Sequence, residues 1–79
     1  MDRQLADIAT EIVQTWRPIH YAAQPYVDAM LRLGTLRESY GADDARGIVL
    51  YFLSNARTWR GDDAKRIKAE LNRMLKGGA

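Results

Sequence analysis

The chain has 79 residues, a length that accommodates one domain. Its hydrophobic content of 47% and charged content of 28% exclude an intrinsically disordered chain, and the absence of cysteine excludes disulfide bonds. The longest apolar run, residues 48–53, is far shorter than the roughly 20 residues that a membrane-spanning helix needs, so we expect no membrane contact.

An amphipathic helix is predicted at the start of the chain, over residues 2–16. Apolar residues recur there at the three- and four-residue spacing of a one-sided helix: Leu5, Ile8, Ala9, Ile12, Val13 and Trp16. Asp2 is a suitable N-cap, and Pro18 ends the helix because proline disfavours helical geometry in the residue before it. Residues 17–25 are expected to form either a turn or a short helical piece.

A second, shorter helix is predicted over residues 25–33. Pro25 suits its first position, which leaves Gln24 outside the helix, and Gly34 is a natural stop. We expect this helix to bury three apolar side chains: Val27, Met30 and Leu31. Residues 35–42 then form a loop, and the side chains that we expect to tuck under the fold are Leu36 and Tyr40.

A helix-start pattern occurs twice in the second half of the chain, in Tyr40–Ile48 and again in Trp59–Ile67. Each copy has an aromatic residue, a glycine, two aspartates, an alanine, a basic residue and an isoleucine in that order. Aspartate accepts hydrogen bonds from the unpaired N–H groups of a first helical turn, so both aspartate pairs are predicted to cap helices. Metal binding is disfavoured for the same pairs, because neither has the spaced acids of an oxygen-ligand site.

The third helix is predicted over residues 44–58, with a broad apolar face formed by Ala45, Ile48, Val49, Phe52, Leu53, Ala56 and Trp59. Because it is apolar on more than one side, we expect it to be the central helix. Leu50 lies off the main face and is interpreted as core, while Tyr51 fits either the core or the centre of an interface. Gly47 suggests that another helix approaches closely, although a tolerated glycine fits nearly as well.

The fourth helix is predicted over residues 63–75, followed by a frayed end at residues 77–79. Its inner stripe consists of Ala64, Ile67, Leu71, Met74 and Leu75, and five cations lie on its other faces: Lys65, Arg66, Lys68, Arg73 and Lys76. The fold class is therefore predicted to be all-α, a small compact bundle of about four helices that forms one domain over residues 1–79.

The net charge of +2 conceals an asymmetry between the two halves of the chain. Residues 1–44 carry seven acidic and four basic side chains, whereas residues 45–79 carry three acidic and eight basic ones. The halves can attract each other within one molecule or between two copies, and the basic half can bind an anionic partner. A homodimer is a possible consequence, and it would also enlarge the small core of so short a chain.

The candidate partner-binding residues are the cations of the last helix with the two arginines before it, together with one aromatic residue: Arg57, Arg60, Lys65, Arg66, Lys68, Arg73, Lys76 and Tyr51. We interpret the chain as a non-catalytic protein that acts by macromolecular interaction, with a protein as its partner. The alternative is a small DNA- or RNA-binding domain that uses the basic face of the last helix. Asp62 and Asp63 argue against the alternative, since they open the helix that would approach the phosphates.

Catalysis is not expected. A nucleophile needs an adjacent base, and His20 is the single histidine that could serve as one. The weakest hypothesis is an enzyme or carrier with a pocket near His20, Tyr21 and Tyr26. We therefore expect no enzyme activity, no cofactor, no metal and no small-molecule ligand. The amphipathic N-terminus does not resemble a signal peptide, and we expect a cytoplasmic protein.

Overall fold

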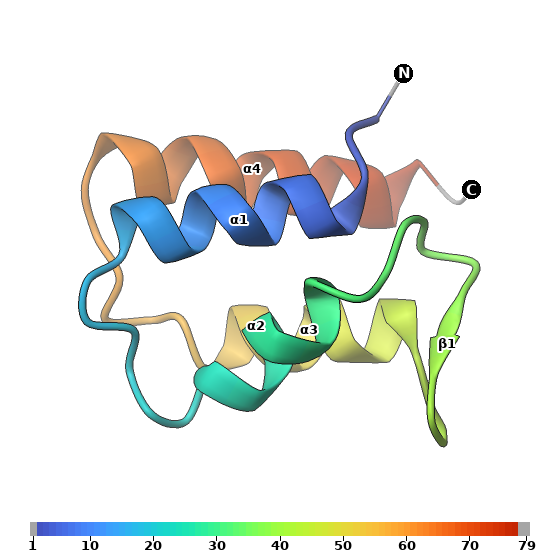
Figure 1. Ribbon diagram of the computed structural model, residues 1–79. Helices are drawn as coiled ribbons and strands as arrows, with labels where there is room; N and C mark the ends of the chain where they lie inside the picture. Colours follow the sequence, from blue (N-terminus) through green and yellow to red (C-terminus); the bar gives the residue numbers. More distant parts are fainter. Residues whose placement is uncertain (1, 78–79) are drawn as a thin grey trace.

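The computed structural model describes residues 2–77, which form four helices and a short hairpin. The helices are α1 (Leu5–Thr15), α2 (Gln24–Met30), α3 (Ala45–Ser54) and α4 (Asp62–Lys76), and β1 (Ser39–Tyr40) pairs antiparallel with β2 (Asp43–Asp44). Two layers result: α1 lies beside α4, and α2 lies beside α3 (Figure 1). The all-α bundle of four helices is confirmed. Of the frayed end predicted at residues 77–79, only Gly77 lies within the described residues.

The core lies between the two layers and consists of apolar side chains from all four helices. The largest fully buried side chains are Phe52, Leu5, Ile8, Ile12, Met30, Ile67, Leu71, Val27 and Val49. Phe52 meets two tryptophan rings edge-on, with ring centroids 6.3 Å from Trp16 and 6.4 Å from Trp59. The two tryptophans stack on each other at 5.2 Å. The apolar stripes predicted for the first and last helices are therefore largely correct.

The first helix is shorter than predicted, and its N-terminus is capped differently. Asp2 does not cap it. Backbone carbonyls from the segment after α2 accept from its first N–H groups: Leu5 N donates to Gly34 O at 2.8 Å, and Ala6 N donates to Leu33 O at 2.9 Å. Val13 lies at the edge of the apolar stripe and is exposed, contrary to prediction.

The second helix begins and ends earlier than predicted. Gln24 is the first residue of α2 and Pro25 the second, so the prediction that Pro25 opens the helix and Gln24 stays outside it is wrong. The helix stops at Met30, and the turn that follows exposes Leu31 and buries Leu33 in its place, so the prediction for Leu31 is wrong. Residues 16–23 form bends and a turn, which settles the open choice in favour of a turn.

The loop predicted at residues 35–42 contains half of a hairpin. Leu36 is buried as expected. Tyr40 is exposed, contrary to prediction, because it pairs with Asp43 in a two-stranded hairpin whose first strand has both residues exposed to solvent. Gly41 sits at the tip with a φ of 65°, a left-handed conformation that glycine adopts without strain.

The two aspartate pairs behave differently, although their sequences are alike. In the first pair, Asp44 is the N-cap of α3 and its Oδ1 accepts from Gly47 N at 2.7 Å. A Cβ on Gly47 would lie 2.9 Å from that oxygen, so the close neighbour of this glycine is the capping carboxylate and not another helix. In the second pair, Gly61 (φ 111°) is the N-cap, and Asp62 and Asp63 lie inside the first turn.

This difference predicts unequal effects of removing the two carboxylates. Asp44→Ala removes the cap of α3 and is expected to lower the free energy of unfolding by about 1 kcal/mol. Asp62→Ala removes only a negative charge at the positive end of the α4 dipole, and it should lower the free energy of unfolding by about 0.3–0.5 kcal/mol. Urea denaturation of both variants measures the two losses of stability. Equal losses would contradict the different roles of Asp44 and Asp62.

The third helix is also shorter than predicted, since it ends at Ser54. Ala56 and Trp59 are buried all the same, because the chain after the helix runs back against the core. α3 contacts α2, α4 and β2, as expected of a central helix, but one of its sides remains open to solvent. Leu50 lies on that side, so its interpretation as a core residue is wrong.

Candidate functional site

The predicted basic surface is divided by the structure into parts with different roles. One part is an ion-pair network between the start of the chain, α1 and α4. Arg3 binds Glu70 through two hydrogen bonds of 2.7 and 2.9 Å and also pairs with Glu11 at 2.9 Å. Arg66 in turn binds both Glu11 and Asp63. Arg66 is thus engaged within the molecule, although the sequence nominated it for a partner.

The network changes the acidity of its members. Hydrogen bonds from Arg66 and Arg3 lower the pKa of the Glu11 carboxyl, and the Arg3 hydrogen bond lowers the pKa of Glu70. The same contacts raise the pKa of both guanidiniums further above their ordinary value. All these groups therefore remain charged near neutral pH, and the network stabilises the packing of α1 on α4.

The second part of the basic surface is a shallow hollow around Trp59. Its lining includes four of the nominated cations: Arg57, Arg60, Lys65 and Lys68. Its volume is about 360 Å³. Lys68 Nζ donates to Trp59 O at 2.7 Å and lies 6.0 Å from the centre of the indole ring. Burial, followed by the charge of Arg60, lowers the pKa of Lys68, so cations here already repel one another. We call these four residues the cationic hollow.

The remaining nominated cations, Arg73 and Lys76, lie in the last turn of α4 and are exposed. Cations in that position stabilise the negative end of a helix dipole, which gives both residues a structural role. Neither residue lines the cationic hollow.

Tyr51, the nominated aromatic residue, belongs to an uncharged surface of α3. The solvent-facing side of this helix, which we call the α3 face, consists of Leu50, Tyr51 and Ser54, with the half-buried Gly47 at its start. Arg46 is also half-buried and borders Leu50, but its Nη2 donates to Leu75 O at 2.7 Å and so is bound to the end of α4. Leu50 and Tyr51 are each 54% exposed, the largest exposed fractions among the large apolar and aromatic side chains of the four helices. Tyr51 stacks on Tyr26 of α2 at a centroid distance of 5.6 Å. The sequence places Leu50 off the main apolar face, which was the signal for its exposure, but the interpretation as core left it out of the candidate partner-binding residues.

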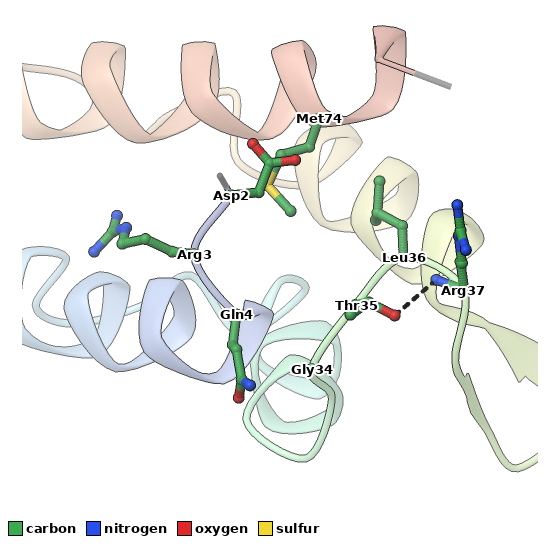
Figure 2. Close-up of a pocket in the computed structure, with 8 residues that line it drawn as sticks. All are labelled: Asp2, Arg3, Gln4, Gly34, Thr35, Leu36, Arg37 and Met74. Atoms are coloured by element: carbon green, nitrogen blue, oxygen red, sulfur yellow. Dashed lines mark hydrogen bonds between the residues drawn. The ribbon is translucent and has the colours of Figure 1, made fainter. Parts of the chain in front are cut away.

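A hollow of about 290 Å³ lies between the start of the chain, the loop after α2 and the end of α4. Figure 2 shows Met74 extending from α4 toward Asp2, with Leu36 on the facing loop. Arg3 and Arg37 lie on opposite sides of this hollow, and Arg3 is bound by Glu70 and Glu11. The buried lining is therefore a thioether and an aliphatic side chain, which suit apolar contact and not proton transfer.

The surroundings of His20 offer no nucleophile with an activating base. His20 Nδ1 accepts from Ala22 N at 3.1 Å, and its ring stacks on Tyr21 at 4.7 Å. His20 lines a hollow of about 180 Å³ together with Ser54 and Arg57, but the Ser54 hydroxyl donates to the carbonyl of Leu50 at 3.0 Å. Over residues 2–77, no three acidic or histidine side chains gather as a metal site requires.

No helix within residues 2–77 combines the length and apolar character needed to cross a membrane.

In comparisons with known proteins, the chain matches no protein-family model, and no curated protein or solved structure is significantly similar to it.

Proposed function

We propose that this protein is a non-catalytic interaction domain that binds a protein partner through the α3 face. The single observation that carries the proposal is the exposure of Leu50 and Tyr51, side by side on a helix surface whose one bordering cation, Arg46, is bound to Leu75 O of α4. Every residue from Gly47 to Ala56 is uncharged, whereas the outer side of α4 carries Lys65, Arg66 and Arg73. A solvated helix face is normally polar, so selection for solubility alone does not account for the α3 face.

The composition of the α3 face is that of the centre of a protein–protein interface. Aromatic side chains supply much of the binding energy at such centres, and charged groups are depleted there. Tyr51 is held in position by its stack on Tyr26, so little side-chain entropy is lost when a partner covers it. Ser54 is small, which allows a partner's side chains to approach the helix one turn after the two large residues. A cytoplasmic location remains part of this proposal.

The proposal is tested by capturing partners with the purified protein, its Leu50→Glu variant and an Arg32→Glu control, in extracts of the source cells. A protein bound by the parent and by the control, but lost with Leu50→Glu, is identified, purified and retested by calorimetry. We expect an affinity loss of at least tenfold for Leu50→Glu. Because Leu50 is exposed, the thermal midpoint of the Leu50→Glu variant should stay within about 2 °C of that of the parent. Equal binding by all three proteins overturns the proposal.

A second candidate function rests on the cationic hollow, which can accept a phosphate group of a nucleic acid. Three of its members, Arg57, Arg60 and Lys65, form no ion pair within the described part of the chain. Each phosphate contact contributes a term to affinity that falls with salt concentration. This candidate ranks second because the hollow exposes no aromatic side chain on which a base could stack: Trp59 is 4% exposed.

Salt dependence separates specific use of the hollow from a general effect of charge. If nucleic acid binds there, neutralising Arg57, Arg60 and Lys65 to glutamine should reduce the slope of log K against log salt concentration by about 0.9 for each phosphate that the variant no longer neutralises. Fluorescence anisotropy with labelled duplex and single-stranded DNA at several salt concentrations measures that slope. An Arg32→Gln, Arg37→Gln, Arg73→Gln variant, with the same reduction of charge elsewhere, should retain it. Equal slopes for the two triple variants eliminate the hollow as the binding site.

A further inference from the structure

We infer that the partner of the α3 face is the same face of a second copy of this chain, packed antiparallel about a two-fold axis. The inference rests on the proposed function, since it names the occupant of the surface proposed there. It is carried by the distribution of charge at the two ends of the face, which is opposite in sign and lies the same number of residues from the centre.

The N-terminal end of the α3 face is acidic. Asp44 Oδ1 binds the Gly47 N–H, and it lies 2.9 Å from where a Cβ on Gly47 would be. The capping carboxylate therefore lies against the first residue of the face, and Asp43 precedes it, also exposed. The positive end of the helix dipole does not neutralise two carboxylates, so this end attracts cations.

The C-terminal end of the same face is basic. Arg57 lines one small hollow together with Ser54 and Asn55, so it lies near the last residue of the face, between that face and the cationic hollow. Arg57 is exposed and forms no ion pair within residues 2–77. The C-terminal end of α3 therefore attracts an acidic group.

Only an antiparallel orientation of two α3 helices brings the acidic end of each face against the basic end of the other. In an antiparallel pair centred between Leu50 and Tyr51, Gly47 of one copy faces Ser54 of the other. Asp44, the N-cap of one helix, then comes close to the turn after the other helix, which carries Arg57. Two equivalent ion pairs then form around an uncharged centre, and the two helix dipoles also oppose each other favourably. A parallel pair would place Asp44 against Asp44 and Arg57 against Arg57, which costs energy at both ends.

The area available predicts a weak dimer. The protein exposes 5087 Å², and stable complexes of small proteins cover about one tenth of the surface of each partner. A single ten-residue helix with its flanks supplies about that area, at the low end of specific interfaces. We therefore expect a dissociation constant of about 10–500 μM.

Cysteine cross-linking tests the orientation directly, because the chain contains no native cysteine. At 1.5 Å rise per residue, an antiparallel pair brings Leu50→Cys of both copies within about 2 Å along the helix axis, while Ser54→Cys of the two copies are about 10 Å apart. Mild oxidation should therefore convert most of the Leu50→Cys protein to a disulfide dimer and leave Ser54→Cys and an Arg32→Cys control monomeric. Circular dichroism confirms that each variant is folded.

Sedimentation equilibrium between 10 μM and 1 mM then measures self-association. We expect Arg57→Glu, which places a carboxylate against Asp44 in both symmetric contacts, to weaken the dimer at least tenfold at low salt, with no change for the control Arg32→Glu. A monomer throughout this range overturns the inference but leaves the proposed function open to the capture experiment. Cross-linking of both Leu50→Cys and Ser54→Cys shows a parallel pair and also overturns it. A dimer that neither cysteine traps overturns the inference and removes the main support for the α3 face.

Discussion

Replacing Phe52 with alanine is expected to lower the free energy of unfolding by about 3–5 kcal/mol. Phe52 is fully buried, and its ring lies edge-on to Trp16 and Trp59. The substitution removes the apolar surface that the ring buries, leaves a cavity that two rigid indoles cannot fill, and ends both aromatic contacts. A domain of this size has a total stability of about 4–12 kcal/mol, so the variant should be close to unfolding at 25 °C.

Urea denaturation followed by tryptophan fluorescence measures this loss, since both indoles report on the same site. Phe52→Leu is the matched control: it keeps most of the buried volume and should cost about 1–1.5 kcal/mol. Tyr51→Ala, next to it on the exposed side of α3, should change stability by less than 1 kcal/mol. A loss for Phe52→Ala no larger than that of Tyr51→Ala would contradict the position of the core.

The parts of the fold that sequence predicts well are those decided by local periodicity. Ile67 and Leu71 lie on one stripe of a helix whose other residues are mostly charged, so no alternative face competes for burial. Helix ends were predicted less well because distant groups determine them. α1 is capped by the carbonyls of Leu33 and Gly34, and the first residue of α3, Ala45, donates to the carbonyl of Glu38. No pattern within either helix carries that information.

The repeated aspartate motif shows that the position of one glycine changes which residue caps the helix. The glycine lies one position later in the second copy, so Gly61 takes the N-cap position and both aspartates move into the helix. There Asp63 pairs with Arg66 instead of capping. Two segments of nearly the same composition thus begin helices in different ways, which a comparison of residue types alone does not reveal.

The availability of the cations for a partner also depended on tertiary structure. Arg66 and Glu11 are far apart in the sequence, and only the packing of α1 beside α4 joins them (Figure 1). The sequence did predict attraction between an acidic first half and a basic second half, and this pair is an instance of it. The Arg3–Glu70 pair has the opposite polarity, so charge totals could not have predicted it.

Acid should destabilise the protein through the network in which Glu11 binds Arg3 and Arg66. Hydrogen bonds from these arginines hold the pKa of Glu11 below its usual value in the folded protein, and Arg3 does the same for Glu70. The unfolded chain therefore binds protons at a higher pH than the folded one. The stabilisation is complete above about pH 5 and is lost progressively as the pH falls through 4.5 toward the lowered pKa values.

Glu11→Gln removes the central carboxylate of this network and is expected to lower the free energy of unfolding at pH 7 by about 1–2 kcal/mol, because two arginines lose their shared partner. It should also make the decline of stability between pH 5 and pH 3 less steep, since Glu11, one of the two carboxyls with a lowered pKa, no longer titrates. Urea denaturation at intervals of half a pH unit measures both effects. Asp7→Asn, on the same helix but outside the network, should preserve the parent's acid dependence to within about 0.5 kcal/mol. If the Glu11→Gln variant instead lost stability in acid as steeply as the parent, the α1–α4 ion pairs would not persist in solution, and Arg66 would be free to bind a partner with the cationic hollow.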